Sequence, residues 1–362
     1  MTLNMEALRW NLSQLPALEK AWDFRLMPVL KMVACHPAVV SAVRDAGYRR
    51  YGAAEVDEPA FWGEANMVQD TRPVLISLPP LHRADDVVRI FDRSPVDSME
   101  ALESLDAAAS RLGRSHKVII MLDLGDMREG VPVAHAKDFF QAAQGRFPHL
   151  QLDGLGVTMG CLYGAAPDDI AMKQMADAAA ALHAIAGSCP RISLGGSVFW
   201  DWWAEHHDEF RRPEGSVVEL RIGDPLLLGY DSYHNKDSAG GHFRRDLFKL
   251  HATVLEIMER DLQQPRVQTI NGQGESVKVK QSGLHRRALL DCGILHTNVL
   301  QLSLDIPDAA IVDFSGNYTI LDITNCAVPV HAGDTISFTP AYWAVAQSFR
   351  NPMVRKHCLP CA

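Results

Sequence analysis

Short apolar runs rich in β-branched residues alternate with amphipathic stretches along the first two thirds of the chain. The runs have the patterning of strands, and the stretches between them repeat apolar residues at helical spacing. The expected strands cover residues 24–32, 48–51, 74–78, 87–91, 117–122, 154–158, 191–194 and 216–222. The expected helices include residues 37–46, 98–112, 134–146 and 168–186. Eight strands alternating with helices over about 200 residues are typical of an α/β fold of the (β/α)8 TIM-barrel type.

The pattern changes after about residue 237, where strand-like stretches are separated by Gly, Asn and Pro. The expected strands there include residues 277–280, 288–291, 318–323 and 335–338. We therefore predict two domains, a barrel over residues 1–237 and a mostly β C-terminal domain over residues 238–362.

Composition narrows the class of protein. The 362 residues are 47% hydrophobic and 22% charged, and the formal charge is −9 with Lys and Arg scattered along the chain. This distribution argues against a nucleic-acid partner. The first residues lack the pattern of a signal peptide, and no apolar run is long enough for a membrane span. Seven widely spaced cysteines suit a reducing compartment, so we expect a cytoplasmic protein.

The active site of a barrel lies at the carboxyl ends of its strands, so the polar residues that follow each strand are the candidates for chemistry. Lys31 lies at the end of the first expected strand, directly after its apolar residues. An amine there could form a Schiff base if it is held neutral, or it could simply be a surface residue that closes the strand. Asp123, Asp126 and Arg128 follow the fifth expected strand, where they either take part in chemistry or cap a helix and pair with one another.

The last expected strands lead into turns suited to a phosphate group. Two glycines precede Ser197 at the start of a helix, and Arg221 and Gly223 stand at the end of the eighth strand. Exposed N–H groups at a helix start attract phosphate, and barrels often bind phosphate in this region. Thr158 ends the sixth strand and faces the same rim. A phosphate-bearing aldehyde cofactor fits one lysine, two such turns and two arginines better than a metal ion does.

Segments in both predicted domains resemble one family of enzymes. They are LNMEALRWNL, VLKMVACHPAVVSAVRDAGYRRYGAAEV, MLDLGDMREGV, DGLGVTMGC, ISLGGS, LRIGDPLLLG, DFSGNYTILDIT, VHAGDTISF and YWAVAQSFRNPMV. In this order and spacing they resemble the alanine-racemase-like enzymes that use pyridoxal 5'-phosphate (PLP), and especially the ornithine-racemase-like branch. The resemblance implies an amino-acid racemase with a small-molecule substrate, and ornithine, lysine or arginine as the substrate class.

The resemblance also implies roles for single residues. Lys31 matches the Schiff-base lysine, which is also one of the proton-transfer bases. Arg221 matches the arginine that faces the pyridine nitrogen, and its permanent charge limits the electron-sink character of the cofactor. Arg128 matches an arginine that contacts the phenolic oxygen of the cofactor and the carboxylate of the substrate.

The phosphate ligands that the resemblance implies are Ser197 and the backbone N–H groups of Gly223 and Asp224. Thr158 stands where alanine racemases carry a histidine that packs against the cofactor ring. Ser315, Gly316 and Asn317 match the loop that these enzymes present to the active site of a partner subunit. A head-to-tail homodimer with shared active sites is therefore implied.

The chain also departs from the alanine racemase pattern. Cys35 stands where those enzymes carry a phosphate-binding tyrosine, and Phe349 stands near the position of another. A racemase needs an acid or base on each face of the α-carbon. No tyrosine of residues 237–283 matches the second base, which alanine racemases supply from the partner subunit. The remaining candidates are His285, Cys292 and Tyr318.

Two alternatives to a racemase stay open. One is a lyase on the same scaffold that cleaves a β-hydroxy amino acid with the help of a metal. The tail residues His357, Cys358 and Cys361 resemble the zinc-ligand tails of D-threonine aldolases and D-serine dehydratases, but four ligands are not evident and no metal is assigned. The other alternative is a PLP carrier without turnover, which the missing second tyrosine favours and the β domain opposes.

Overall fold

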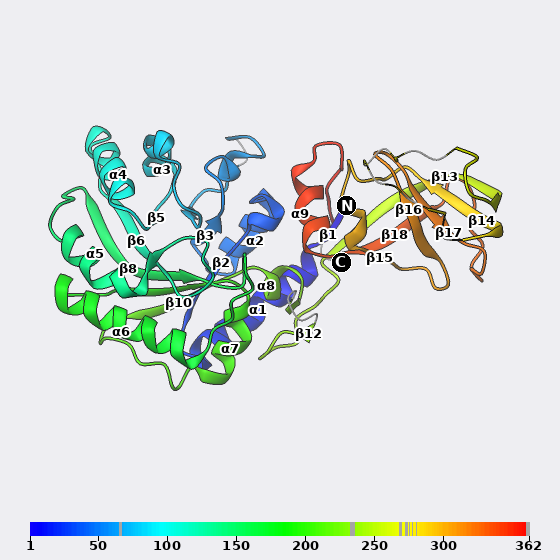
Figure 1. Ribbon diagram of the computed structural model, residues 1–362. Coiled ribbons are helices and arrows are strands. Elements are labelled where there is room, and N and C mark those ends of the chain that lie inside the picture. Colours follow the sequence, from blue (N-terminus) through cyan, green and yellow to red (C-terminus); the bar gives the residue numbers. More distant parts are fainter. Residues whose placement is uncertain are drawn as a thin grey trace. The chain divides into compact units, whose positions relative to one another are not determined.

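The computed structural model describes residues 1–64, 67–231, 236–267, 270–271, 274, 276, 278–279 and 281–359. The chain divides into two compact units, Glu6–Arg245 and a second unit that joins Met1–Met5 to Asp246–Ala362 (Figure 1). The division falls eight residues after the expected boundary at 237. The first residues belong to the second unit because β1 (Thr2–Asn4) pairs with β13 (Phe248–Leu262) and with β19 (His357–Leu359).

Parallel strands form the interior of the first unit. The longer ones in the described part of the chain are β2 (Arg25–Pro28), β3 (Arg50–Ala53), β4 (Arg72–Leu75), β5 (Arg93–Val96), β6 (His116–Asp123), β8 (Leu150–Thr158), β9 (Arg191–Gly195) and β10 (Val217–Ile222). One sheet has the order β2-β10-β9-β8-β6-β5, the short β7 (Val131–Pro132) pairs with β6, and β3 and β4 form a separate pair. Such a strand order, with neighbours in sequence lying side by side, is that of a barrel.

The circle of strands is only partly closed by hydrogen bonds. A single bridge between Val29 and Gly52 joins the end of β2 to β3. The Asp92 N–H donates to the Pro73 carbonyl at 2.9 Å, which joins the start of β5 to β4. The unit is therefore a mixed α/β structure with parallel strands and partial barrel closure.

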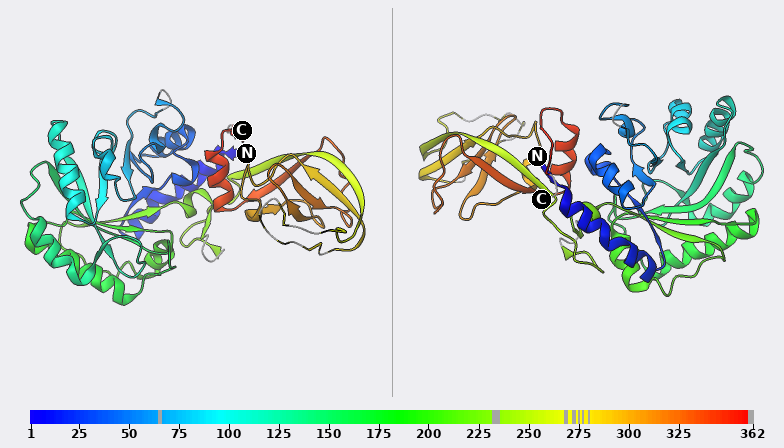
Figure 2. Two further views of the ribbon diagram at one scale, coloured as in Figure 1. Left: turned by 45° about the horizontal axis from the view of Figure 1, so that its top comes forward. Right: turned by 180° about the vertical axis from the view of Figure 1, so that it is seen from behind.

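Helices lie on the outside of these strands (Figure 1, Figure 2). They are α1 (Met5–Ala21), α2 (Pro37–Asp45), α3 (Ala84–Ile90), α4 (Met99–Arg111), α5 (Ala136–Ala143), α6 (Asp169–Ala186), α7 (Val198–His206) and the short α8 (Asp224–Leu227). Side-chain caps fix two of the helix starts. Ser98 accepts from the Ala101 N–H at 3.3 Å before α4, and Asp168 accepts from the Ala171 N–H at 2.7 Å before α6.

One expected barrel strand is wrong. Residues 87–91 lie in or next to α3, and the strand at this point of the fold is β5, which begins at Arg93. Val87 and Val88 are buried on the inner face of the helix, and Asp85 and Asp86 stand in its first turn, where the helix dipole favours acids. A short apolar run is compatible with a buried strand or a buried helix face, so periodicity alone did not separate the two.

The second unit is built on an antiparallel sheet. Its path β15-β18-β13-β14-β17-β16 uses β14 (Gly283–Leu290), β15 (Leu302–Leu304), β16 (Ala310–Phe314), β17 (Thr319–Asp322) and β18 (Thr335–Pro340). The helix α9 (Tyr342–Arg350) follows β18. The expected β character of this part is present. Of the expected strand 277–280, residues 277 and 280 lie outside the described residues.

In the part of the chain that the structure describes, no helix combines the length and apolar character needed to span a bilayer.

Candidate active site

Lys31 lies directly beyond the end of β2. The Val29 N–H donates to the Ile222 carbonyl at 2.8 Å and the Leu30 N–H donates to the Gly52 carbonyl at 2.9 Å, so the chain stays between β10 and β3 up to residue 30. Lys31 then opens a 3-10 turn (Lys31–Val33). Its side chain is half-buried and makes no hydrogen bond or ion pair with the described residues. An unpaired amine therefore stands at the carboxyl edge of the strands.

The backbone behind Lys31 is strained. Ala34 and Cys35 have φ angles of 45° and 51°, a left-handed conformation that residues with a Cβ rarely adopt. The Trp62 indole N–H donates to the Ala34 carbonyl at 2.8 Å and holds this conformation. Cys35 is buried with 3% exposure, so its thiol is part of the packing behind the turn.

Arg221 projects from β10 into the interior of the barrel, where it is buried. Its Nη1 donates to the carbonyl and the hydroxyl of Ser193 at 3.0 and 2.7 Å. Its Nη2 donates to the Val157 carbonyl at 2.8 Å and to Oγ1 of Thr158 at 3.1 Å. All four acceptors are neutral. Burial lowers the pKa of the Arg221 guanidinium to about 10, and the nearby charge of Glu219 opposes that shift.

Gly195 makes room for this arginine. A Cβ on Gly195 would lie 2.0 Å from Nη2 of Arg221, so a side chain there would occupy the place of the guanidinium. Within the described structure Nε of Arg221 has no hydrogen-bond partner. The arginine is thus fixed by its two terminal nitrogens and keeps one donor for another group.

Two turns suited to an anion meet beside Arg221. Ser197 precedes α7 and Gly223 precedes α8, and the Asp224 N–H donates to Oγ of Ser197 at 3.4 Å. A Cβ on Gly223 would lie 3.1 Å from the Val29 carbonyl oxygen, which brings this turn against the strand that leads to Lys31. The first N–H groups of a helix have no partner inside it and attract negative charge.

Gly196 shapes the first of these turns. Its φ angle is +115°, and a Cβ there would lie 2.2 Å from the Met159 carbonyl oxygen. Only glycine fits both conditions. The glycine pair noted in the sequence therefore has two separate functions, since Gly195 admits Arg221 and Gly196 allows the turn at Ser197.

Arg128 lies in the loop after β6. It forms a two-point ion pair with Glu129, and its Nη1 contacts Sγ of Cys161 in the loop after β8. Hydrogen bonding to Glu129 raises the pKa of the Arg128 guanidinium despite partial burial. Its side chain is 31% exposed, so it keeps a face toward solvent at the same edge of the sheet.

The two aspartates near Arg128 hold loops. Oδ1 of Asp123 accepts from the N–H groups of Gly125 and Met127 at 2.9 and 3.1 Å. Asp126, which is 2% exposed, accepts from the Cys161 and Leu162 N–H groups, both at 3.2 Å. Within the described structure neither aspartate caps a helix or pairs with Arg128, as the sequence had suggested, and both instead hold loops through backbone hydrogen bonds.

Gly316 and Asn317 lie in the second unit, in the turn between β16 and β17. The Ser315 N–H donates to the Tyr318 carbonyl at 2.8 Å and closes the turn. The carbonyls of Ser315 and Gly316 accept from the N–H groups of residues 294 and 295 at 3.0 and 2.9 Å. Asn317 is exposed, and Tyr318 is exposed by 45%.

The three candidates for a second base differ in whether their side chains are hydrogen-bonded, buried or exposed. Nδ1 of His285 lies 2.8 Å from Asp322, and its Nε2 lies 3.2 Å from the Ser282 carbonyl. Cys292 is buried, and burial raises the pKa of its thiol to about 11. Tyr318 is the one of the three whose side chain is exposed.

Phe349 and the tail lie in the second unit as well. Phe349 is buried in α9 with its ring edge against Phe248 at 5.7 Å between centroids. His357 and Cys358 belong to β19, and Cys361 lies outside the described residues. Among the residues that are described, no group of three or more His, Cys, Asp and Glu side chains could hold a metal ion.

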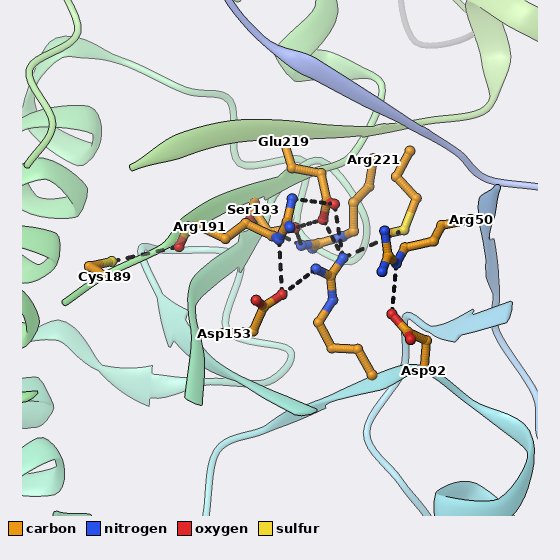
Figure 3. A network of polar contacts seen from close by, with 10 residues as sticks. Arg50, Asp92, Asp153, Cys189, Arg191, Ser193, Glu219 and Arg221 are labelled. Carbon is orange, nitrogen blue, oxygen red and sulfur yellow. Dashed lines mark hydrogen bonds and ion pairs between the residues drawn. The ribbon is translucent and has the colours of Figure 1, made fainter. Parts of the chain in front are cut away.

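A buried network of ion pairs below Arg221 was not predicted from the sequence (Figure 3). Glu219 accepts from Arg93 at 2.6 and 2.9 Å, from Arg191 at 3.0 Å and from the Ser193 hydroxyl at 2.8 Å. Asp153 accepts from Arg93 at 2.6 Å and from Arg191 at 3.0 Å. The available signal was the pair of charged residues in VVELRI, a strand that is otherwise apolar.

Comparison with known proteins identifies the scaffold. Residues 3–213 match the model of the alanine racemase N-terminal domain. The chain belongs to this family. Two curated racemases are similar to it over most of their lengths. An ornithine racemase from Acetoanaerobium sticklandii is 26% identical over 291 residues, which are 80% of this chain and 80% of that protein. A lysine racemase from Thermotoga maritima is 22% identical over 356 residues, 98% of this chain and 97% of that one.

A solved structure supports the same fold for this member of the alanine racemase family. The alanine racemase from Bartonella henselae, described with covalently bound pyridoxal phosphate, is 16% identical. It matches with a TM-score of 0.71 over 99% of this chain and 98% of that chain.

Proposed function

We propose that the protein is a PLP-dependent racemase that interconverts the L and D enantiomers of a basic amino acid, with ornithine, lysine and arginine as the substrate class. The observation that carries the proposal is the arrangement of Lys31, Arg221 and the turn at Ser197 on one edge of a family scaffold. The proposal includes a closed (β/α)8 barrel, a cytoplasmic location and a head-to-tail homodimer.

The residues at this edge fit PLP. The cradle at Gly195 holds Arg221 with Nε unpaired, which suits a donor to a ring nitrogen. Ser197 and the N–H groups of Gly223 and Asp224 supply donors for a phosphate. Lys31 supplies the amine for the aldehyde carbon, and Thr158 lies beside Arg221 at 3.1 Å, where the ring would pack. When bound, PLP withdraws electrons from the α-carbon of an amino acid and makes its proton more acidic.

The chain's own residues would then move the proton and hold the substrate. Lys31 takes and returns the α-proton on one face. Arg128, backed by Glu129, binds the substrate carboxylate, because a guanidinium pairs with a carboxylate through two parallel hydrogen bonds. Arg221 keeps its own proton and so leaves the ring nitrogen unprotonated.

The opposite face needs a separate group, because a proton returned to the face it left regenerates the starting enantiomer. Tyr318 is the exposed candidate, and it shares its turn with Gly316 and Asn317. We propose that this turn reaches the active site of the partner subunit. The turn is exposed, as such a contact requires, and the side chains of His285 and Cys292 are engaged or buried within their own unit.

The substrate class follows from the two curated relatives, which are an ornithine racemase and a lysine racemase. Their activities also favour a racemase over a lyase. From the sequence, Asp126 and Asp224 could each supply a negative charge for the side chain of a basic substrate. Asp126 is not proposed for this role, because both of its oxygens accept backbone hydrogen bonds.

Chiral chromatography of PLP-loaded protein incubated with L-ornithine, L-lysine, L-arginine and L-alanine tests the proposal. We expect the D enantiomer of at least one basic amino acid. Lys31→Ala should lower the rate by at least about 100-fold, the lower range for a lost general base. Lys173→Ala, which alters an exposed lysine paired with Asp177, should leave the rate unchanged. No D product from any basic amino acid, or a Lys31→Ala variant with the wild-type rate, would overturn the proposal.

A further inference from the structure

The network below Arg221 connects that arginine to a buried carboxylate through one hydroxyl group. Ser193 on β9 and Glu219 on β10 stand opposite each other in the strand register. The Ser193 hydroxyl donates to Glu219 at 2.8 Å and accepts from Nη1 of Arg221 at 2.7 Å (Figure 3). Because a hydroxyl has one proton, its donation to Glu219 turns its lone pairs toward Arg221. Glu219 therefore fixes the orientation of the acceptor that Arg221 uses.

The negative charge of Glu219 also acts on Arg221. The cluster contains three arginines, Arg93, Arg191 and Arg221, but two carboxylates, Asp153 and Glu219. Arg93 and Arg191 each pair with both carboxylates, whereas Arg221 bonds only neutral oxygens. Burial makes the charge of a guanidinium that is 8% exposed costly, and a nearby negative charge stabilises its protonated form. Glu219 is on the same strand face, two residues away.

We propose that Ser193 and Glu219 are positioning residues that keep the Arg221 guanidinium charged and aimed at the cofactor's ring nitrogen. This inference rests on the proposed function, since it concerns the same site. It assigns a role in the reaction to residues that touch neither the substrate nor the cofactor.

The charges around Arg221 set the sign of the expected effect. Burial lowers its pKa to about 10, Glu219 and Glu129 raise it, and Arg93 and Arg128 lower it further. Glu219→Gln removes the larger of the two supporting charges. Arg221 should then lose its proton at a lower pH, so the alkaline limit of activity and of the bound-cofactor absorbance should move to lower pH.

Asp153→Asn is the matched control. Asp153 accepts from the same two arginines as Glu219, but its described contacts include neither Ser193 nor Arg221. Both variants break buried ion pairs and should lower the unfolding temperature. Only Glu219→Gln should move the pH profile.

Two variants, Ser193→Ala and Ser193→Thr, test whether the Ser193 hydroxyl orients Arg221. Ser193 borders a cavity lined also by Met27, Ile119 and Met121, and threonine keeps the hydroxyl at the same position of the side chain. We expect Ser193→Ala to weaken PLP binding by about tenfold, the effect of one hydrogen bond to a charged group, and Ser193→Thr to restore it. A lost orientation should lower kcat more than it raises KM for the substrate.

The measurements are the dissociation constant for PLP, the absorbance of the bound cofactor against pH, and kcat and KM on the PLP-loaded protein. Equal pH profiles for Glu219→Gln and Asp153→Asn, or Ser193→Thr behaving as Ser193→Ala, would overturn the inference while the wild type still binds PLP and racemises. Wild-type protein that fails to bind PLP would overturn the proposed function and this inference with it.

Discussion

Nη2 of Arg221 occupies the space where a side chain on Gly195 would begin, 2.0 Å from the position of a Cβ atom. The two residues lie opposite each other on the adjacent strands β9 and β10. The guanidinium can cross to Val157 on β8 only because the strand between them carries no side chain at this point. The position of the Arg221 guanidinium thus depends on Gly195 as well as on its own hydrogen bonds.

Gly195→Ala should displace Arg221. We expect a loss of about 1–3 kcal/mol in the free energy of unfolding, the usual effect of overpacking, together with weaker PLP binding. Gly52→Ala on β3 is the control, because its Cβ would meet the side-chain methyl groups of Ile76 at 2.9 Å and Val29 at 3.2 Å and no atom of Arg221. Urea unfolding and PLP titration of both variants give the comparison. Equal PLP affinity in the two variants would contradict the role of Gly195.

Tyr318→Phe should separate proton removal from inversion. If Tyr318 supplies the proton on the second face, the variant should lose racemisation by about 100-fold or more while still exchanging the α-proton on the Lys31 face. Cys292→Ser is the control, because this thiol is buried in the second unit and should not affect inversion. Chiral analysis and mass spectrometry in deuterated water report the two events. Full racemisation by Tyr318→Phe would show that another group acts on that face.

Asp126→Ala should affect stability and not substrate choice. Its carboxylate accepts from two backbone N–H groups of the loop at 161–162, so its loss leaves buried donors unpaired and should cost about 1–3 kcal/mol. The ratio of kcat/KM for ornithine to that for alanine should stay the same. A large drop in this ratio would mean that Asp126 recognises the side-chain ammonium after all.

Asp322 should make the stability of the second unit depend on pH. Although burial opposes ionisation, hydrogen bonds from Thr324, Gln281 and His285 lower the pKa of Asp322 to about 2. The folded pKa is depressed, so its stabilising contribution is complete above about pH 4 and is lost as pH falls toward 2. Asp322→Asn should therefore be less stable than wild type by about 1–2 kcal/mol at pH 7, and the difference should shrink toward pH 2. Urea unfolding across this range measures it, and a difference that does not change with pH would contradict the assignment.

Most of the barrel could be predicted because local patterns specify it. The strand VVELRI is recognised by its apolar residues, and the helix that follows Asp168 by its apolar spacing and its N-cap. Each of these signals lies within a short segment of the chain. The expected strand at residues 87–91 was wrong because a short β-branched run also suits the buried face of α3. Lys31, Arg221 and Ser197 could be named as candidates because a barrel presents its chemistry at strand ends.

The ion network was not predicted because its members come together only in three dimensions. Arg93 and Glu219 are 126 positions apart in the chain and meet across the interior of the barrel. No local pattern records such a contact. The same holds for Asp126, which holds a loop 35 residues later in the chain.

Proton exchange tests the central claim most directly. PLP-loaded protein is incubated in deuterated water with single enantiomers of ornithine, lysine and arginine, and deuterium at the α-carbon and the configuration are measured in the same samples. The account predicts deuterium incorporation with inversion on at least one basic amino acid, from either enantiomer. Exchange with complete retention, or no exchange on any of them, would contradict it.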